Sequence, residues 1–402
     1  MDAPYLMHKM GGILMYNFDN LLDRRNTDCV KWDELEDVFG SSDLLPYWVA
    51  DMDFEVLPEI REALVKRAEH ATYGYTFATK DYYKNFIKWN KERNDFEINK
   101  DEIISVPGVV CATSFVIYAF TQKGDKVLLN TPIYNPFFDV INAHKREMVT
   151  SKLILNNERY EMDWEDFENK LKDNVKLFIL CSPHNPVGRV WTREELEKIV
   201  KLCKENNVLI FSDEIHSDLI FPGHKHIPTL NVSKDAEDIT ISAMAPSKTF
   251  NIAGLKSSMI LVKNKELKEK LAEAIEAFDL GVGLFGYKAT EIAYGYGAKW
   301  TDELISYLYE NAKFVVDFFE KNMPKVKAYV PDGTYLMWLD FSAYGLGQKE
   351  ILEKLKYEAR VALNDGEKYG KEEGLGFMRL NIGTTRETLK KGLERIKKSF
   401  QD

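Results

Sequence analysis

The feature that most constrains the fold is a regular alternation of short apolar runs with amphipathic segments between residues 59 and 262. Helical spacing of the apolar residues marks the amphipathic segments, and residues 192–206 open with a capping box. The apolar runs predict buried strands at residues 126–130, 176–181, 208–212, 239–242 and 258–262. Buried strands joined by helices predict an α/β fold, in which a mostly parallel sheet is flanked by helices on both faces.

A second pattern begins near Trp300. One long helix, residues 302–322, is followed by strands around 327–330, 335–341 and 377–382 and by helices near 349–360 and from 386. Because 402 residues exceed the roughly 250–300 at which single cores stop growing, we expect two domains. We expect a large domain at residues 58–290 and a smaller α+β domain built from residues 15–57 and 291–402. Residues 1–14, before Met15, would be an N-terminal extension.

The composition of the chain limits the classes of partner that it could bind. A formal charge of -10 argues against nucleic acid or an anionic membrane, since either would favour a basic face. The longest uncharged stretch, residues 103–122, contains Pro107-Gly108 and predicts a strand end, a turn and a buried helix. Four cysteines are far apart, with no metal-ligand spacing, so we expect no metal and a cytoplasmic protein.

Chemically informative side chains follow three of the predicted strands. Asn185 comes shortly after one strand, Asp213 ends the next, and Lys248 follows another. Parallel sheets bind ligands beyond the carboxyl ends of their strands, so these residues are expected to share one pocket. An amine that can bond an aldehyde, and a carboxylate that keeps a pyridine nitrogen protonated, are what pyridoxal 5'-phosphate requires.

These motifs resemble fold-type I pyridoxal phosphate enzymes of the class I/II aminotransferase superfamily. Residues 47–54 (Tyr-Trp-Val-Ala-Asp-Met-Asp-Phe), 183–191 (Pro-His-Asn-Pro-Val-Gly-Arg-Val-Trp) and 213–216 (Asp-Glu-Ile-His) are similar to its MalY/PatB cystathionine β-lyase branch. The resemblance covers nearly the whole chain from about residue 15. It implies an aspartate aminotransferase-like fold, with pyridoxal phosphate bound by the large domain.

The resemblance also implies roles for single residues. Lys248 would bind the cofactor covalently and later remove the Cα proton, while Asp213 would pair with the pyridine nitrogen. Asn185 would bond the ring oxygen, and Tyr134 would stack on the ring. For the substrate, Arg379 interrupts an apolar strand and has the planar fork that suits a carboxylate. We expect substrate contacts from Arg379, Asn185 and Ala50, and a minor cofactor contact from His216.

The cofactor phosphate needs amide donors and positive charge. Val109 and Val110 open a predicted helix, whose first amides are free and carry the positive end of the helix dipole. Ser247 and Lys256 would add a hydroxyl and a cation, although the superfamily usually has arginine at the position of Lys256. Tyr75 matches a residue that reaches the neighbouring subunit's phosphate, which implies a homodimer with shared active sites.

Two outcomes share this chemistry. Expulsion of a sulfur group from Cβ would give thiol, pyruvate and ammonia from L-cystathionine or a related cysteine S-conjugate. Return of the proton to the cofactor would instead give an aminotransferase. The resemblance favours the carbon–sulfur β-lyase, and a regulatory binding protein on the same scaffold is a third possibility.

Overall fold

The computed structural model describes residues 8–10 and 13–401. Most of the expected N-terminal extension therefore lies outside the described residues. Near the N-terminus, β1 (His8–Met10) pairs antiparallel with β2 (Ile13–Met15).

An eight-stranded sheet forms the centre of the molecule, in the order β4-β11-β10-β9-β8-β5-β6-β7. The pairs from β10 to β6 are parallel, whereas β11 is antiparallel to both its neighbours and β7 to β6. This sheet confirms the predicted α/β class. Its strands are β4 (Ile103–Val106), β5 (Lys126–Thr131), β6 (Glu147–Asn156), β7 (Arg159–Met162), β8 (Val175–Cys181), β9 (Leu209–Asp213), β10 (Thr240–Met244) and β11 (Ser258–Leu261).

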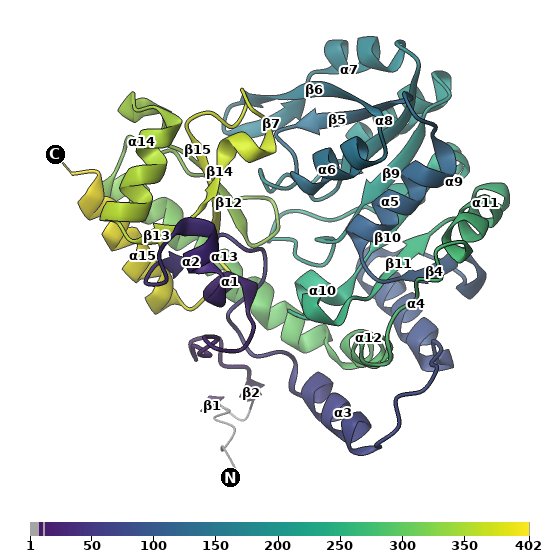
Figure 1. Ribbon diagram of the computed structural model, residues 1–402, viewed down its shortest axis with the longest axis horizontal. Helices are drawn as coiled ribbons and strands as arrows, with labels where there is room; N and C mark the ends of the chain where they lie inside the picture. Colours follow the sequence, from purple (N-terminus) through teal and green to yellow (C-terminus); the bar gives the residue numbers. More distant parts are fainter. Residues whose placement is uncertain (1–7, 11–12, 402) are drawn as a thin grey trace.

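Helices cover both faces of this sheet (Figure 1). Side chains alternate along each strand, so Val127 and Leu129 pack in one core while Leu128 packs in another. The first core includes α5 (Val109–Phe120), α6 (Pro136–Ala143) and α11 (Lys265–Glu276). The second includes α7 (Trp164–Leu171), α8 (Arg193–Glu205) and α9 (Lys234–Ile239).

The N-terminal and C-terminal segments pack together. In Figure 1 the purple helices α1 (Val30–Asp33) and α2 (Leu35–Phe39) lie beside the yellow C-terminal elements. β3 (Leu45–Pro46) pairs in parallel with β13 (Val361–Ala362). This pairing supports the expectation that residues before 58 belong to the smaller domain. On that basis we propose the domain boundaries expected from the sequence.

The C-terminal part also contains a three-stranded sheet, β12-β15-β14. Its strands are β12 (Leu336–Asp340), β14 (Asn364–Asp365) and β15 (Phe377–Asn381). The strand predicted at 327–330 is wrong, because only Lys327 bridges to Asp340 before the chain turns away at Pro331.

The remaining helices are α3 (Pro58–Glu69), α4 (Lys80–Asn94), α10 (Pro246–Thr249), α12 (Leu284–Tyr296), α13 (Ala298–Asn322), α14 (Gln348–Glu353) and α15 (Arg386–Ser399). α14 continues as a turn of π-helix, Lys354–Glu358, within the helix predicted at 349–360. Of the helices in the described part of the chain, none has the length and apolar content that a membrane crossing needs.

Candidate active site

A cavity of about 630 Å³ lies beyond the carboxyl ends of the parallel strands. This volume falls in the range of small-molecule sites, roughly 300–1,000 Å³. The cavity is lined by nearly every residue predicted from the sequence: Ala50, Val109, Val110, Tyr134, Asn185, Asp213, His216, Ser247, Lys248 and Lys256. Cys111, Ser114, Cys181, Ile215, Ala253 and Ser257 also line it.

Lys248 projects into this cavity from the short helix α10, directly after β10. Its Nζ donates a hydrogen bond of 2.8 Å to the carbonyl of Ala50. Burial lowers the pKa of Lys248 to about 8, and Arg379 adds to the effect, while Asp51 and Asp213 oppose it. A substantial fraction of the amine is therefore neutral near physiological pH, as a nucleophile or base must be.

Asp213 ends β9 at the floor of the cavity and is buried. One carboxylate oxygen accepts a hydrogen bond from the amide of Ile215 at 3.0 Å. Burial raises the pKa of Asp213 to about 7, although that amide and Lys248 both lower it. A cationic partner such as a pyridinium would relieve the cost of keeping this carboxylate charged.

Arg379 approaches the cavity from β15 in the C-terminal sheet. It does not line the cavity in its own right, but Nη1 donates to Oδ1 of Asn185 at 3.2 Å and Nη2 donates to the Trp48 carbonyl at 2.7 Å. The guanidinium lies over the ring of Tyr369, 5.1 Å from its centroid. Its Nε is buried and has no partner among the described residues, so one donor remains for a ligand.

His216 and Tyr134 complete the walls around Asp213. The Nδ1 atom of His216 is buried without a partner in the described part of the chain, and the ring packs edge-on against Tyr335. Burial lowers the pKa of His216 well below its usual value, so the imidazole is neutral. Tyr134 is partly buried and packs edge-on against Phe137, which leaves its ring facing the cavity that it lines.

The other end of the cavity lies against the first turn of α5. Gly108 precedes this twelve-residue helix and offers no side-chain cap, so the amides of Val109 and Val110 have no cap within the described residues. Ser247, Lys256 and Ser257 line the same cavity. Ser257 was not predicted. Its hydroxyl accepts from Thr290 at 2.8 Å, and its position directly after Lys256 was the available signal in the sequence.

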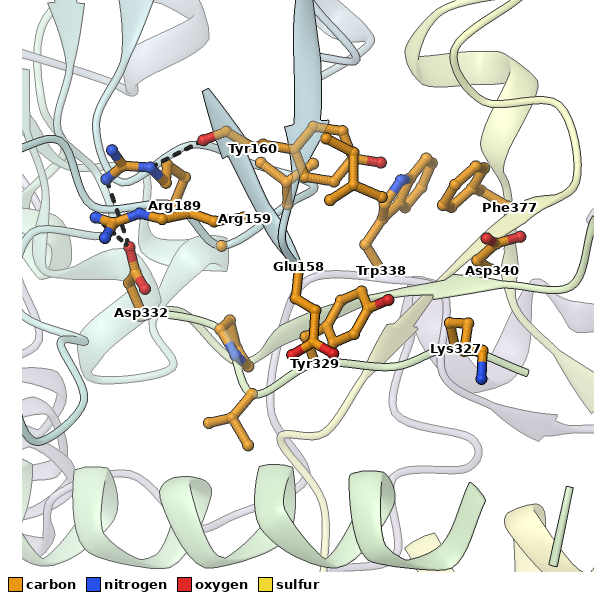
Figure 2. A pocket seen from close by; sticks show the side chains of 15 residues that line it. Glu158, Arg159, Tyr160, Arg189, Lys327, Tyr329, Asp332, Trp338, Asp340 and Phe377 are labelled. Carbon is orange, nitrogen blue, oxygen red and sulfur yellow. Dashed lines mark hydrogen bonds and ion pairs between the residues drawn. The ribbon is translucent and has the colours of Figure 1, made fainter. Parts of the chain in front are cut away.

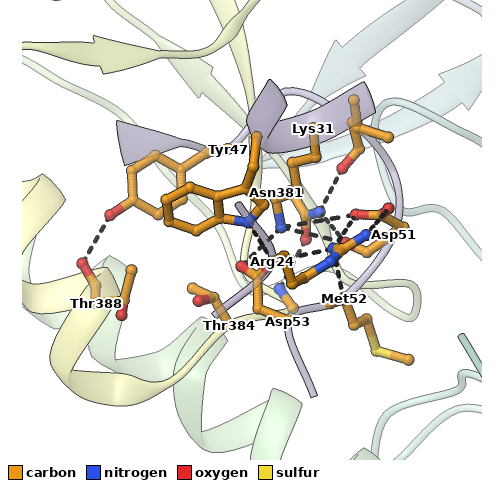
Figure 3. Close-up of polar contacts among 12 residues, drawn as sticks. Arg24, Lys31, Tyr47, Asp51, Met52, Asp53, Asn381, Thr384 and Thr388 are labelled. Carbon is orange, nitrogen blue, oxygen red and sulfur yellow. Dashed lines mark hydrogen bonds and ion pairs between the residues drawn. The ribbon is translucent and has the colours of Figure 1, made fainter. Parts of the chain in front are cut away.

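A loop at residues 48–53 forms the remaining wall and is held mainly through its backbone (Figure 3). Asn381 donates to the carbonyls of Val49 and Asp51, both at 2.6 Å. Asn251, three residues after Lys248, bonds both the amide and the carbonyl of Met52. Neither asparagine was predicted, although Asn381 lies two residues after Arg379 and so on the same face of β15.

Charged side chains secure the outer side of this loop. Lys31 donates to Asp53 at 2.8 Å, and both side chains are buried. Arg24 bonds Asp51 at 2.7 Å and Asp53 at 3.1 Å. Figure 3 shows these two cations converging on the two carboxylates, so that the buried charge of Asp53 is balanced.

Apart from Arg379, which is joined to the cavity through Asn185, Tyr75 is the predicted site residue that does not line the cavity. It lies in the irregular segment between α3 and α4, fully exposed to solvent, and is absent from the cavity lining. Its predicted role, reaching the site of a second subunit, stays a prediction.

A second, smaller cavity lies between the β6–β7 hairpin and β12 (Figure 2). Arg159 and Arg189 both pair with Asp332 at 3.5 Å, and Arg189 also bonds the Tyr160 carbonyl. At about 50 Å³ it could hold a few waters but not an amino acid. The larger cavity is therefore the candidate active site.

The larger cavity fits pyridoxal phosphate at both ends. Lys248 and Asp213 supply the amine and carboxylate for the ring end, and the uncapped amides of α5 supply donors for a phosphate. The buried Nδ1 of His216 and Nε of Arg379 have no partner among the described residues and remain for a bound ligand. Among the described residues, no group of His, Cys, Asp and Glu is arranged to hold a metal ion.

Comparison with known proteins agrees with this geometry. The model of the family "Aminotransferase class I and II" matches residues 48–396. The chain belongs to this family. Cystathionine beta-lyase PatB of Bacillus subtilis is 44% identical over 383 residues, which cover 95% of this chain and 99% of PatB.

Solved structures of other family members resemble the chain along nearly its whole length. A candidate aminotransferase from Clostridium difficile 630, with bound pyridoxal phosphate, superposes with a TM-score of 0.94 at 43% identity, covering 96% of this chain and 100% of that one. Cystalysin from Treponema denticola, which contains pyridoxal 5'-phosphate, gives a TM-score of 0.92 at 37% identity and covers 96% and 99%. This chain thus has an aspartate aminotransferase-like fold, as its sequence predicted.

Proposed function

We propose that this protein is a pyridoxal phosphate-dependent carbon–sulfur β-lyase that cleaves L-cystathionine or related cysteine S-conjugates to thiol, pyruvate and ammonia. The observation that carries the proposal is the convergence of Lys248, Asp213 and Asn185 on one cavity, with Arg379 bonded to Asn185. The similarity to PatB, named a cystathionine beta-lyase, supports the choice of reaction.

Lys248 and Asp213 divide the work at the cofactor. When bound, pyridoxal phosphate supplies a covalent link to the substrate amine and an electron sink for charge developing at Cα. Asp213 would hold the ring nitrogen in its protonated form. Lys248, whose amine lies beside the Ala50 carbonyl, would accept the Cα proton.

Arg379 and Asn185 would orient the substrate. The guanidinium is already fixed by Asn185, Trp48 and Tyr369, so little side-chain freedom is lost when it binds an α-carboxylate. A carboxylate held there would place Cα near Lys248. The Cβ–S bond then breaks with its electron pair on sulfur, and water completes the conversion to pyruvate and ammonia.

We also propose that the protein acts as a homodimer. Tyr75 is exposed together with Tyr73 and Phe77 on the segment between α3 and α4, and such an apolar patch favours a protein partner. A second copy would cover these rings and bring Tyr75 to the phosphate end of its neighbour's cavity. Four free cysteines support a reducing, cytoplasmic location.

The test of this proposal compares substrate classes. Purified protein with pyridoxal phosphate should release pyruvate from L-cystathionine and other thioether amino acids much faster than it transfers amino groups from ordinary amino acids to 2-oxo acids. The candidate aminotransferase among the similar structures makes transamination the second function to consider. Faster transamination than thioether cleavage would establish that function instead.

A further inference from the structure

The carbonyl of Ala50 accepts hydrogen bonds from two side chains at once. Lys248 Nζ donates at 2.8 Å, and the hydroxyl of Tyr335 donates at 2.9 Å. Asn381 holds the carbonyls on either side, those of Val49 and Asp51, so the orientation of the loop does not depend on Lys248 (Figure 3). Both lone pairs of this one oxygen are therefore in use.

Tyr335 is fixed in place by its surroundings. It is fully buried, it directly precedes β12, and its carbonyl accepts from the amide of Ile382 at 2.8 Å. Its ring packs edge-on against His216 with centroids 5.8 Å apart. Burial raises the pKa of Tyr335 well above its usual value, so the hydroxyl remains a donor at all physiological pH values.

We propose that Tyr335 is a positioning residue for Lys248: by sharing the Ala50 carbonyl, its hydroxyl limits how strongly that oxygen holds the free amine in its protonated form. This inference rests on the proposed role of Lys248 as the base. A hydrogen bond to a charged form stabilises that form, and an acceptor that serves two donors offers less to each. Tyr335 would thus keep more of the amine in its neutral form.

The experiment replaces the hydroxyl alone, in Tyr335→Phe. In full-length protein freed of cofactor, the pH dependence of Lys248 modification by trinitrobenzene sulfonate, read by peptide mapping, reports the pKa of Lys248. That pKa should rise by about half a unit. The charges facing Lys248, those of Arg379, Asp51, Asp213 and Lys256, are unchanged by the substitution.

With pyridoxal phosphate and L-cystathionine, the same variant should lose about threefold in kcat below the pKa of Lys248, with KM unchanged. The loss should disappear at alkaline pH. Tyr47→Phe is the matched control, because Tyr47 is equally buried and its hydroxyl bonds the Thr388 carbonyl instead. Site-specific 3-fluorotyrosine at position 335, a stronger donor of the same shape, should shift the pKa of Lys248 downward.

An unchanged pH profile of Lys248 modification, both in Tyr335→Phe and in the protein with 3-fluorotyrosine at position 335, would overturn the proposal. So would a loss of kcat that is equal at all pH values, or one that Tyr47→Phe reproduces, because a purely structural role predicts both. If the modification profile shifts but thioether cleavage is absent from the unmodified protein, the positioning role stands and the proposed lyase function fails.

Discussion

At the scale of single residues, the candidate site is a set of buried charges whose pKa values are moved toward neutrality. Burial acts on Lys248 and Asp213 in opposite directions, lowering the pKa of the amine to about 8 and raising that of the carboxyl to about 7. Such shifts are typical of groups that exchange protons at physiological pH. They also make the stability of the cofactor-free protein depend on pH.

For Lys248, the direction in which stability changes with pH follows from its lowered pKa. The folded chain releases the proton near pH 8 and the unfolded chain near 10.5, so the folded state binds fewer protons between these values and stability rises with pH. In Lys248→Met this increase should be smaller by on the order of 2 kcal/mol, allowing for partial exposure. Denaturant unfolding of both proteins across the window measures it, and parallel curves would show that Lys248 titrates normally.

A second residue-scale prediction concerns Asp213. In Asp213→Ala the cofactor should still bind Lys248, but turnover of L-cystathionine should fall by about 10²- to 10³-fold, because an unprotonated pyridine accepts less negative charge. Asp213→Glu keeps the carboxylate and should lose less. Steady-state kinetics with absorbance of the bound cofactor separates the two effects, and turnover near that of the original protein in Asp213→Ala would remove the residue from the mechanism.

At the scale of elements, the loop at 48–53 connects three parts of the chain. Asn251 bonds it from the segment after Lys248, Asn381 from β15, and Lys31 from α1. Three separate parts of the chain therefore hold this wall of the cavity in place.

Removal of one of these attachments should be costly. Asn251→Ala leaves the amide and carbonyl of Met52 and the carbonyl of Phe54 without this partner, so the free energy of unfolding should fall by about 1–3 kcal/mol. Asn156→Ala, at an exposed position on β6, is the control and should change it by less than about 0.5 kcal/mol. Equal effects in urea unfolding would mean that Asn251 does not secure the loop.

Sequence patterns predicted the residues at strand ends but not those that support them. Asp213 and Lys248 follow apolar strands, and that position alone places them at the edge of a parallel sheet. Tyr335 bonds a carbonyl 285 residues away, and no local pattern encodes such a contact. The β6–β7 hairpin was missed because β6 is exposed over much of its length and lacks a clear alternation.

At the scale of the whole molecule, the dimer remains to be tested. If each site uses Tyr75 of the other subunit, inactive Tyr75→Ala and inactive Lys248→Ala proteins should recover up to about a quarter of the original activity after subunit exchange, because mixed dimers carry one intact site. No recovery, with exchange confirmed by differently tagged subunits, would show that Tyr75 acts within its own chain or has no role.

The most direct test of the central claim is sustained turnover of L-cystathionine with no 2-oxo acid present. A transaminase stops after one turnover under these conditions, since the amino group remains on its cofactor, whereas a β-lyase continues. We predict equal amounts of pyruvate and thiol in large molar excess over protein, and none from Lys248→Ala. Product that never exceeds one equivalent per subunit would contradict the lyase function.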